Sequence, residues 1–273
     1  MLVRSLLFAP ANRPDLFGKF PRLEADLFAL DLEDGTPADA RAAARAGLAD
    51  AVRAARGTRS GKLFVRINPA GSSDFAPDLA AAQGAGVDGL ILAKAESAAD
   101  VARLRTDLPV IAGIESIAGV MNAAAIAAGP SVFAVYFGAE DFAADMGARR
   151  TPEGLEVLYA RSRVVLAAKA ARVRALDQVV LDLKDETLFR RDATLGRNLG
   201  YDGKLCIHPR QIALANEVYA PTPGEIDHAR RLVAAYDAAR ARGEATLDFE
   251  GRMVDGPVYK TALATLAAAE PAG

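Results

Sequence analysis

The sequence has almost none of the residues that form disulfides or zinc sites. Its 273 residues include one cysteine, Cys206, and two histidines, His208 and His228. A single cysteine excludes a disulfide within the chain and fits a reducing compartment. These three residues are also a poor basis for a zinc ion, which is held by three or four cysteine, histidine or acidic ligands. We therefore interpret Cys206 as a core residue and expect a protein of the cytoplasm.

Long apolar runs and an excess of one charge are also absent. The first apolar run, around Ser5–Pro10, is too short for the hydrophobic region of a signal peptide. No run approaches the roughly 20 apolar residues of a membrane-spanning helix. The formal net charge is −2, so the chain lacks the basic bias that nucleic-acid-binding proteins show. The sequence thus favours a soluble protein that binds neither membranes nor nucleic acid.

What the sequence does contain is a regular alternation of strand-like and helix-like segments. Apolar residues make up 51% of the chain and charged residues 25%, which is typical of a globular protein with a full core. Short apolar runs predict eight strands: Ser5–Ala9, Leu27–Leu32, Leu63–Ile67, Gly89–Ala93, Val110–Ile114, Val132–Phe137, Asp177–Leu181 and Lys204–Ile207. Helical patterns follow them: Asp15–Ala25, Ala38–Ala55, Ser73–Ala85, Ser97–Leu104, Ile117–Ala128, Pro152–Arg174, Lys184–Leu199 and Pro209–Tyr219.

Eight alternating strand–helix units indicate an α/β protein with the (β/α)8 TIM barrel fold. A doubly wound open sheet is the alternative, because strand number is uncertain from one sequence. Such a sheet normally has a glycine-rich phosphate loop after its first strand, and Ala9–Arg13 (APANR) is not such a loop. Polar residues also follow strand after strand, as expected at the face where barrels have their active site. We expect a barrel.

The chain after the eighth strand is longer than a barrel needs. It contains a predicted helix at Glu225–Arg242, an extended segment at Gly243–Asp255 and a second helix at Val258–Ala269. About 50 residues bury too little surface to fold alone reliably. We therefore predict that residues 1–221 form the barrel domain and residues 222–273 a C-terminal helical appendage that acts as a lid.

Two carboxylates, Glu115 and Asp141, follow neighbouring strands in the middle of the chain. Because the strands Val110–Ile114 and Val132–Phe137 belong to one βαβ unit, they should be parallel and adjacent. Ligand sites in such folds lie at the carboxyl ends of strands. Mg²⁺ takes one or two protein carboxylates and completes its shell with water and substrate. Each acid could instead cap the helix that follows it, but their occurrence as a pair favours a metal site.

A set of short motifs extends this interpretation. In chain order they are DLEDG (31–35), VRIN (65–68), KAE (94–96), IES (114–116), GAED (138–141), IHPRQ (207–211) and GRMVDGP (251–257). This ordered set resembles the citrate lyase β-subunit family, within the larger superfamily of 2-oxo-acid aldolases and malyl-CoA lyases. The resemblance covers essentially the whole chain.

The resemblance implies Mg²⁺-dependent cleavage, or the reverse condensation, of a carbon–carbon bond in a β-hydroxyacyl-CoA thioester such as malyl-CoA or citramalyl-CoA. The products would be an acyl-CoA and a 2-oxo acid such as glyoxylate or pyruvate. It also implies a homo-oligomer, a trimer or a hexamer. Glu115 and Asp141 would hold Mg²⁺, for which Mn²⁺ could substitute, and would contact the substrate together with Arg66 and Lys94.

The resemblance also assigns two catalytic roles. Arg66 would stabilise the developing enolate or alkoxide, although it could simply pair with Asp31, Glu33 or Asp34. Asp255, in the C-terminal segment and often acting in a neighbouring subunit's site, would exchange a proton with the acyl-CoA. Its alternative is a turn aspartate. Glu33 and Asp34 are expected to hold Mg²⁺-bound water molecules or Arg66 rather than to bind the metal directly.

The remaining polar residues at the predicted strand ends are weaker candidates. Lys94 invites comparison with the Schiff-base lysines of aldolases, but the acids near it favour an ordinary charged lysine. Arg13 and Lys19 could bind the phosphates of CoA, or could be surface cations. Glu140 and His208 are interpreted as structural.

Three functional hypotheses follow. The first is a stand-alone lyase acting on a CoA thioester. The second is the β subunit of citrate lyase, which acts on a citryl carrier-protein thioester and releases oxaloacetate within a larger complex. The third is a non-catalytic metabolite-binding barrel, against which the presence of Glu115, Asp141, Arg66 and Asp255 argues. Purification as a homo-oligomer without partners would separate the first from the second.

Overall fold

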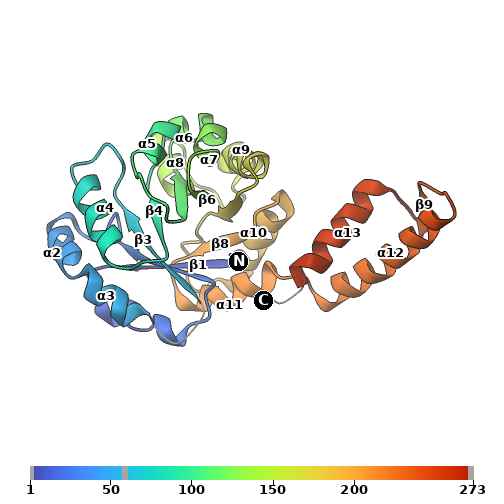
Figure 1. Cartoon of the computed structure of the whole chain (residues 1–273), viewed down its shortest axis with the longest axis horizontal. Helices are drawn as coiled ribbons and strands as arrows, with labels where there is room; N and C mark the ends of the chain where they lie inside the picture. The colour runs from blue at the N-terminus through green and yellow to red at the C-terminus, as the bar shows by residue number, and fades with distance from the viewer. Residues whose placement is uncertain (1–2, 57–60, 270–273) are drawn as a thin grey trace. The chain divides into compact units, whose positions relative to one another are not determined.

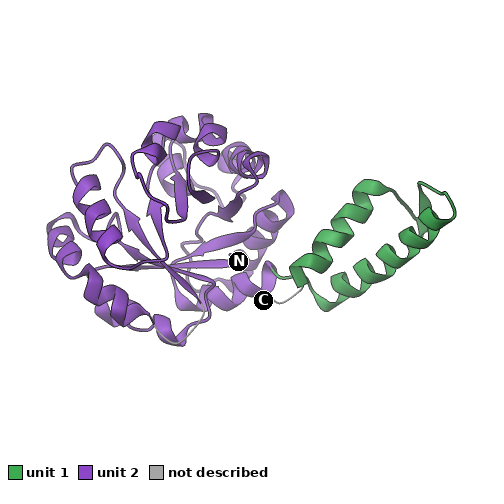
Figure 2. Cartoon of the chain, in the orientation of Figure 1, with its two compact units in different colours: residues 1–2, 220–273 green, residues 3–219 purple. Residues whose placement is uncertain are grey.

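The computed structural model describes residues 3–56 and 61–269, and the chain divides into two compact units (Figure 2). The larger unit runs from Val3 to Tyr219 and the smaller begins at Ala220. In the larger unit, parallel strands pair in chain order and close into a barrel (Figure 1). The strands are β1 Ser5–Pro10, β2 Leu27–Asp31, β3 Lys62–Ile67, β4 Gly89–Leu92, β5 Val110–Ile114, β6 Val132–Phe137, β7 Arg174–Asp177 and β8 Gly203–Cys206. The predicted (β/α)8 barrel is confirmed.

Helices surround the barrel on its outside (Figure 1). They are α1 Pro14–Phe17, η1 Phe20–Arg22, η2 Ala38–Ala40, α2 Arg41–Ala46, α3 Leu48–Ala55, α4 Phe75–Gly84, α5 Ala98–Ala102, α6 Ile117–Met121, α7 Ala123–Ala127, α8 Ala139–Asp145, α9 Leu155–Ala171, α10 Glu186–Leu199 and α11 Pro209–Val218. Among the described residues, no helix combines the length and the apolar character that crossing a membrane requires.

The core has two layers because each strand is covered on both faces. Strands buried in this way read as near-continuous apolar runs, and every residue of β2 and β5 is buried. One layer fills the barrel with side chains from every strand: Leu6, Leu27, Ala29, Phe64, Ile91, Ile111, Ala134, Tyr136, Leu176 and Leu205. The second layer packs the outer strand faces against the helices. A filled barrel leaves its ends as the places where a ligand can bind.

The seventh strand lies earlier in the chain than predicted. It spans Arg174–Asp177, so the prediction of Asp177–Leu181 is wrong except at its first residue. The preceding helix α9 ends at Ala171, where Arg172 adopts a left-handed conformation (φ 59°), and the strand begins two residues later. The apolar run after Asp177 therefore lies beyond the end of the strand, and its Val179 forms part of a cavity wall.

Three predicted helices are shorter than expected or interrupted. The segment Asp15–Ala25 contains only the single turn α1 and then η1, in which Pro21 lies at the first turn. Proline lacks the N–H that a continuous helix would need there. The segment Ala38–Ala55 is interrupted at Gly47, and Ile117–Ala128 divides into α6 and α7.

The smaller unit contains two helices, α12 Pro223–Ala241 and α13 Gly256–Ala269, and between them a hairpin of β9 Leu247–Phe249 and β10 Arg252–Val254. Both helices were predicted, but the segment of the hairpin was predicted only as extended. Its apolar core is small and consists of Ala229, Leu232, Tyr236, Val254 and Ala262. The role of this unit as a lid stays a prediction.

Candidate active site

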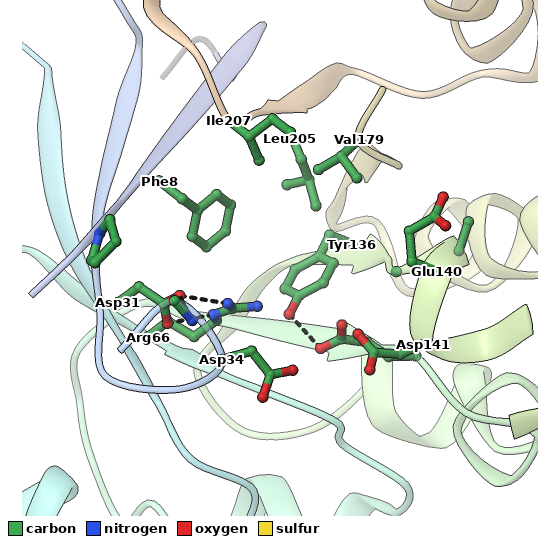
Figure 3. A pocket seen from close by; sticks show the side chains of 15 residues that line it. Phe8, Asp31, Asp34, Arg66, Tyr136, Glu140, Asp141, Val179, Leu205 and Ile207 are labelled. Atoms are coloured by element: carbon green, nitrogen blue, oxygen red, sulfur yellow. Dashed lines mark hydrogen bonds and ion pairs between the residues drawn. The ribbon is translucent and has the colours of Figure 1, made fainter. Parts of the chain in front are cut away.

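A cavity of about 410 Å³ lies at the carboxyl ends of the barrel strands. It is lined by Phe8, Pro10, Asp31, Asp34, Gly35, Arg66, Glu115, Tyr136, Gly138, Ala139, Glu140, Asp141, Val179, Leu205 and Ile207. Figure 3 shows Phe8, Ile207, Leu205 and Val179 on one side, Asp34 and Asp141 on the opposite side, and Arg66 and Tyr136 between them. This is the face at which (β/α)8 barrels have their active sites.

Glu115 follows β5 directly and is 3% exposed. Its Oε1 accepts a hydrogen bond from the hydroxyl of Tyr136 (2.5 Å) and another from the backbone N–H of Lys94 (3.1 Å). Two glycines make room for this carboxylate. A Cβ atom on Gly113 would lie 2.6 Å from Oε1, and one on Gly138 would lie 2.4 Å from Oε2. The carboxylate is therefore held in one orientation, with Oε2 against the loop that follows β6.

The electrostatic surroundings of Glu115 raise its pKa to about 7. Burial is the main cause, because it disfavours the ionised carboxylate. Arg66 and the hydrogen bond from Tyr136 oppose this effect, whereas the negative charges of Asp141 and Glu33 add to it. A cation bound beside Glu115 would favour the ionised form, so this environment suits a metal ligand.

Asp141 lies in the first turn of α8, lines the same cavity and has a half-buried side chain. Within residues 3–56 and 61–269, no three histidine, cysteine or acidic side chains are grouped so that they could hold a metal. Mg²⁺ needs only one or two carboxylates, because water and substrate oxygens complete its shell. The crowded carboxylate of Glu115 and the accessible one of Asp141 therefore fit Mg²⁺ as its two protein ligands.

Arg66, in β3, is held by Asp31 at the end of β2. Its Nε donates to Oδ1 (2.7 Å) and its Nη2 to Oδ2 (2.6 Å), which makes a two-point contact between planar groups. The guanidinium also lies 5.0 Å from the centre of the Phe8 ring. The structural interpretation of Arg66 as a partner of Asp31 is thus correct. These contacts use Nε and Nη2, and Arg66 also lines the cavity.

Lys94 lies in the turn after β4 and joins the acids around the cavity. Its Nζ donates to Glu33 Oε1 (2.6 Å) and Asp34 Oδ2 (2.7 Å), and lies 3.4 Å from Asp141 Oδ1. Burial disfavours the ammonium, but the hydrogen bonds with Asp34 and Glu33 outweigh it, and the pKa of Lys94 is raised. A Schiff-base lysine must lose its proton to attack a carbonyl. This geometry therefore supports an ordinary charged lysine.

Arg13 and Lys19 of the larger unit are not among the residues that line the cavity. Arg13 forms an exposed ion pair with Asp15, and Lys19 is exposed between α1 and η1. Asp255 precedes α13 in the smaller unit, where its Oδ1 accepts a hydrogen bond from the N–H of Val258 (3.3 Å). Their roles in CoA binding and proton transfer stay predictions.

Three residues interpreted as structural have structural contacts. Glu140 pairs with Arg150 (3.0 Å), although it also lines the cavity. His208 caps α11 by accepting a hydrogen bond from the N–H of Arg210 at Nδ1 (3.2 Å). Cys206 is fully buried, and burial raises the pKa of its thiol to about 12.

Sequence reasoning missed Tyr136 and the apolar wall. Tyr136 is the next-to-last residue of β6, and the available signal was its hydroxyl in an otherwise apolar strand, since a buried tyrosine hydroxyl normally has a partner. Phe8 was treated only as part of β1. Val179 was placed inside a predicted strand and so could not be assigned to the cavity.

A second group of buried charges, contributed by β7, β8, α9 and α10, was also missed. Arg161 forms ion pairs with Asp177 and Asp192, and Lys204 pairs with the same two carboxylates. Lys204 also donates to the backbone oxygen of Gln178 (2.7 Å). Two cations here balance two carboxylates. The hydrogen bond from Lys204 also fixes Gln178, the residue that precedes Val179 of the cavity wall.

The fold and this site together define a closed parallel barrel with one cavity that is lined by Arg66, Glu115 and Asp141. Comparison with known proteins identifies the family to which this barrel belongs. Residues 4–209 match the HpcH/HpaI aldolase/citrate lyase family, and the chain belongs to that family.

Individual relatives agree with this assignment over nearly the whole chain. The sequence is 47% identical to a citrate lyase subunit beta-like protein of Deinococcus radiodurans, over 96% of this chain and 95% of that protein. It is 35% identical to a (3S)-malyl-CoA thioesterase of Cereibacter sphaeroides, over 98% and 94%. The crystal structure of CitE from Mycobacterium tuberculosis in complex with magnesium, acetoacetate and coenzyme A aligns with a TM-score of 0.86 at 37% identity, over 97% of each chain. The resemblance to the citrate lyase β-subunit family is confirmed.

Proposed function

We propose that this protein is a Mg²⁺-dependent carbon–carbon lyase. Its substrate is a β-hydroxyacyl-CoA thioester such as malyl-CoA or citramalyl-CoA, and its products are an acyl-CoA and glyoxylate or pyruvate. One observation carries this proposal: Arg66 lies in one cavity with the carboxylates of Glu115 and Asp141 and with an apolar wall (Figure 3). The relative from M. tuberculosis, whose crystal structure contains magnesium, acetoacetate and coenzyme A, supports it.

The reaction breaks the bond between the hydroxyl-bearing carbon and the α-carbon of the thioester. The electron pair of that bond moves to the α-carbon, the hydroxyl gives its proton to water as the carbonyl forms, and the α-carbon takes up one proton, so that the reaction neither consumes nor releases protons overall. A bound Mg²⁺ supplies Lewis-acid polarisation of the hydroxyl and carboxylate oxygens. Glu115 and Asp141 would hold the ion. The hydroxyl of Tyr136 keeps the Glu115 carboxylate in its orientation.

The chain's own residues would stabilise charge and deliver the proton. Arg66 would donate through Nη1 to the oxygen on which negative charge develops, and Asp31 holds the guanidinium so that it need not reorganise during the reaction. Asp255, from a neighbouring subunit, would give the α-carbon its proton. Arg13 and Lys19 would bind the phosphates of CoA.

The charge of the cavity favours an oxo acid with one carboxylate. Arg66 is the one cationic side chain among the described residues that line the cavity, whereas five are acidic: Asp31, Asp34, Glu115, Glu140 and Asp141. Oxaloacetate would bring a second carboxylate towards this acidic or apolar surface, and an unpaired buried charge is strongly unfavourable. The hydrogen of glyoxylate or the methyl group of pyruvate suits the wall formed by Phe8 and Leu205. The β subunit of citrate lyase, which releases oxaloacetate, stays the alternative.

The test is to incubate the purified full chain with Mg²⁺ and malyl-CoA, citramalyl-CoA or citryl-CoA, and to measure oxo acid and free thiol separately. We expect glyoxylate or pyruvate to form while the product thioester stays intact, and EDTA to stop the reaction. Preferred release of oxaloacetate from citryl-CoA would instead indicate a citrate lyase subunit. Free CoA without oxo acid would indicate hydrolysis, the activity named for the C. sphaeroides relative. Binding without turnover would indicate a non-catalytic barrel.

A further inference from the structure

Lys94 contacts four carboxylates at once, although the proposed metal site uses only two of them. Its ammonium lies 2.6 Å from Glu33 Oε1, 2.7 Å from Asp34 Oδ2 and 3.4 Å from Asp141 Oδ1. Its backbone N–H donates to Glu115 Oε1 at 3.1 Å. Two of these acids, Glu33 and Asp34, come from the loop after β2, and the other two follow β5 and β6. Lys94 therefore lies between the proposed metal ligands and two further carboxylates.

The backbone of Lys94 indicates that its side chain matters here. Its φ is 49°, in the left-handed region that residues other than glycine adopt uncommonly. This conformation allows the N–H to reach Glu115 while the side chain extends to Glu33 and Asp34. Glycine would adopt the same backbone without strain and keep the N–H, but it would supply no ammonium. The backbone conformation therefore does not require an ammonium at this position, and the ammonium needs a separate explanation.

The two additional carboxylates would compete for the ion if they were free. A metal ion that activates a substrate needs coordination positions that the protein leaves open. Mg²⁺ has six positions, and each carboxylate from the protein takes at least one of them. Glu33 is 2% exposed, and its Oε2 has no hydrogen bond, only an ionic contact with Arg66 Nη2 at 3.3 Å. Without Lys94, Glu33 would keep only its ionic contact with Arg66 and Asp34 would lose its ion pair, so both carboxylates could bind a divalent cation.

We propose that Lys94 is a positioning residue that keeps Glu33 and Asp34 out of the metal coordination shell, so that only Glu115 and Asp141 bind the ion. The inference rests on the proposed function, because it assumes a divalent ion at Glu115 and Asp141. It has two consequences. The site binds its ion less tightly than the cluster of carboxylates alone would, because the ammonium repels a divalent cation. In return, coordination positions stay open for the 2-oxo acid.

The test uses Mn²⁺ as the probe and five variants of the full chain, four of them single substitutions. Lys94→Met and Lys94→Gly both remove the ammonium, and the glycine variant keeps the left-handed backbone and the N–H. Lys94→Arg keeps the charge. The matched control is Lys169→Met, which removes an ammonium paired with Asp202 (2.6 Å) on the outer helix α9. Electron paramagnetic resonance of free Mn²⁺ gives the dissociation constant, and water-proton relaxation gives the number of water molecules on the bound ion.

We expect both neutral variants to bind Mn²⁺ more tightly, by a factor of about 10 or more. The bound ion should carry fewer water molecules, and pyruvate should bind the Mn²⁺ complex more weakly. Lys94→Arg and Lys169→Met should resemble the unsubstituted protein. Adding Asp34→Asn to Lys94→Gly should restore part of the lost hydration. If Lys94 were only structural, its loss would change folding and leave the hydration of the ion unchanged. If Lys94→Met does not fold, the measurements on Lys94→Gly decide between these two roles.

Unchanged or weaker Mn²⁺ binding in the glycine variant, or tighter binding with unchanged hydration, would overturn the role of Lys94 while leaving the metal site intact. If the unsubstituted protein binds no Mn²⁺, the metal site of the proposed function fails, and the inference fails with it.

Discussion

The raised pKa of Glu115 predicts that the ionised carboxylate destabilises the metal-free protein. The pKa rises from 4.5 to about 7, chiefly through burial. Each pKa unit corresponds to about 1.4 kcal/mol, so the ionised group costs roughly 3 kcal/mol of folding free energy. Below pH 4.5 the carboxyl is protonated in both states and there is no penalty. As the pH rises from 4.5 towards 7, Glu115 ionises in the unfolded chain before it ionises in the native state, which lowers the free energy of unfolding. Above pH 7 the full penalty is present.

The substitution Glu115→Gln removes the charge while keeping the size of the side chain and an oxygen that can accept the hydrogen bond from Tyr136. We expect the variant to match the wild type near pH 4.5 and to be up to about 3 kcal/mol more stable at pH 8 in EDTA. Glu33, whose pKa is also raised by burial, contributes to both proteins, so the difference between the two pH profiles isolates Glu115. Added Mg²⁺ should stabilise the wild type by mass action and leave the variant unchanged.

The measurement is urea unfolding followed by far-ultraviolet circular dichroism between pH 4.5 and 8.5, since the chain has no tryptophan. Glu153→Gln, at an exposed position, is the matched control and should follow the wild type. Parallel pH profiles for the wild type and Glu115→Gln would refute the argument from burial. Equal stabilisation of both proteins by Mg²⁺ would refute the assignment of Glu115 as a ligand.

Three further predictions test the remaining site residues. Asp141→Ala should abolish Mg²⁺ binding by calorimetry and also turnover, while the circular dichroism spectrum stays unchanged, because its half-exposed side chain is not part of the core; retained affinity would remove it from the metal site. Arg66→Lys should lower kcat about 100-fold or more, because lysine lacks the planar fork that contacts Asp31; a change in KM alone would make it a binding residue. Asp255→Asn should be inactive yet still bind Mg²⁺ and pyruvate, and mixing it with Glu115→Ala under subunit exchange should restore part of the activity. Mixed oligomers that stay inactive would contradict its action across a subunit boundary.

The barrel could be predicted because most of its strands are short apolar runs. Strands such as β2 and β5 are covered on both faces, so their sequences are unbroken apolar runs. The same signal failed at β7, because Val179–Leu181 is an apolar run for a different reason: it lies beyond the strand, and Val179 forms part of a cavity wall. Apolar composition does not distinguish a strand from a loop that lines a site.

The candidate site could be predicted by residue type but not by contact. Glu115 was recognisable as an acid at a strand end, but its bond with Tyr136 depends on how β5 and β6 pair. Gly113 lies opposite Tyr136 in that pairing, and a side chain at Gly113 would occupy the place of the tyrosine hydroxyl. The left-handed backbone of Lys94 is likewise a consequence of tertiary structure, since no local glycine or asparagine marks it.

The two groups of charges in the barrel differ in their balance of cations and acids. In the group contributed by β7, β8, α9 and α10, two cations balance two carboxylates: Arg161 and Lys204 pair with Asp177 and Asp192. Such balance is what burial requires, because an uncompensated charge away from water is costly. Around the cavity, two cations, Arg66 and Lys94, face a larger set of acids: Asp31, Glu33, Asp34, Glu115 and Asp141. This excess of acid, expressed in the raised pKa of Glu115, is relieved most directly by a divalent cation from solution.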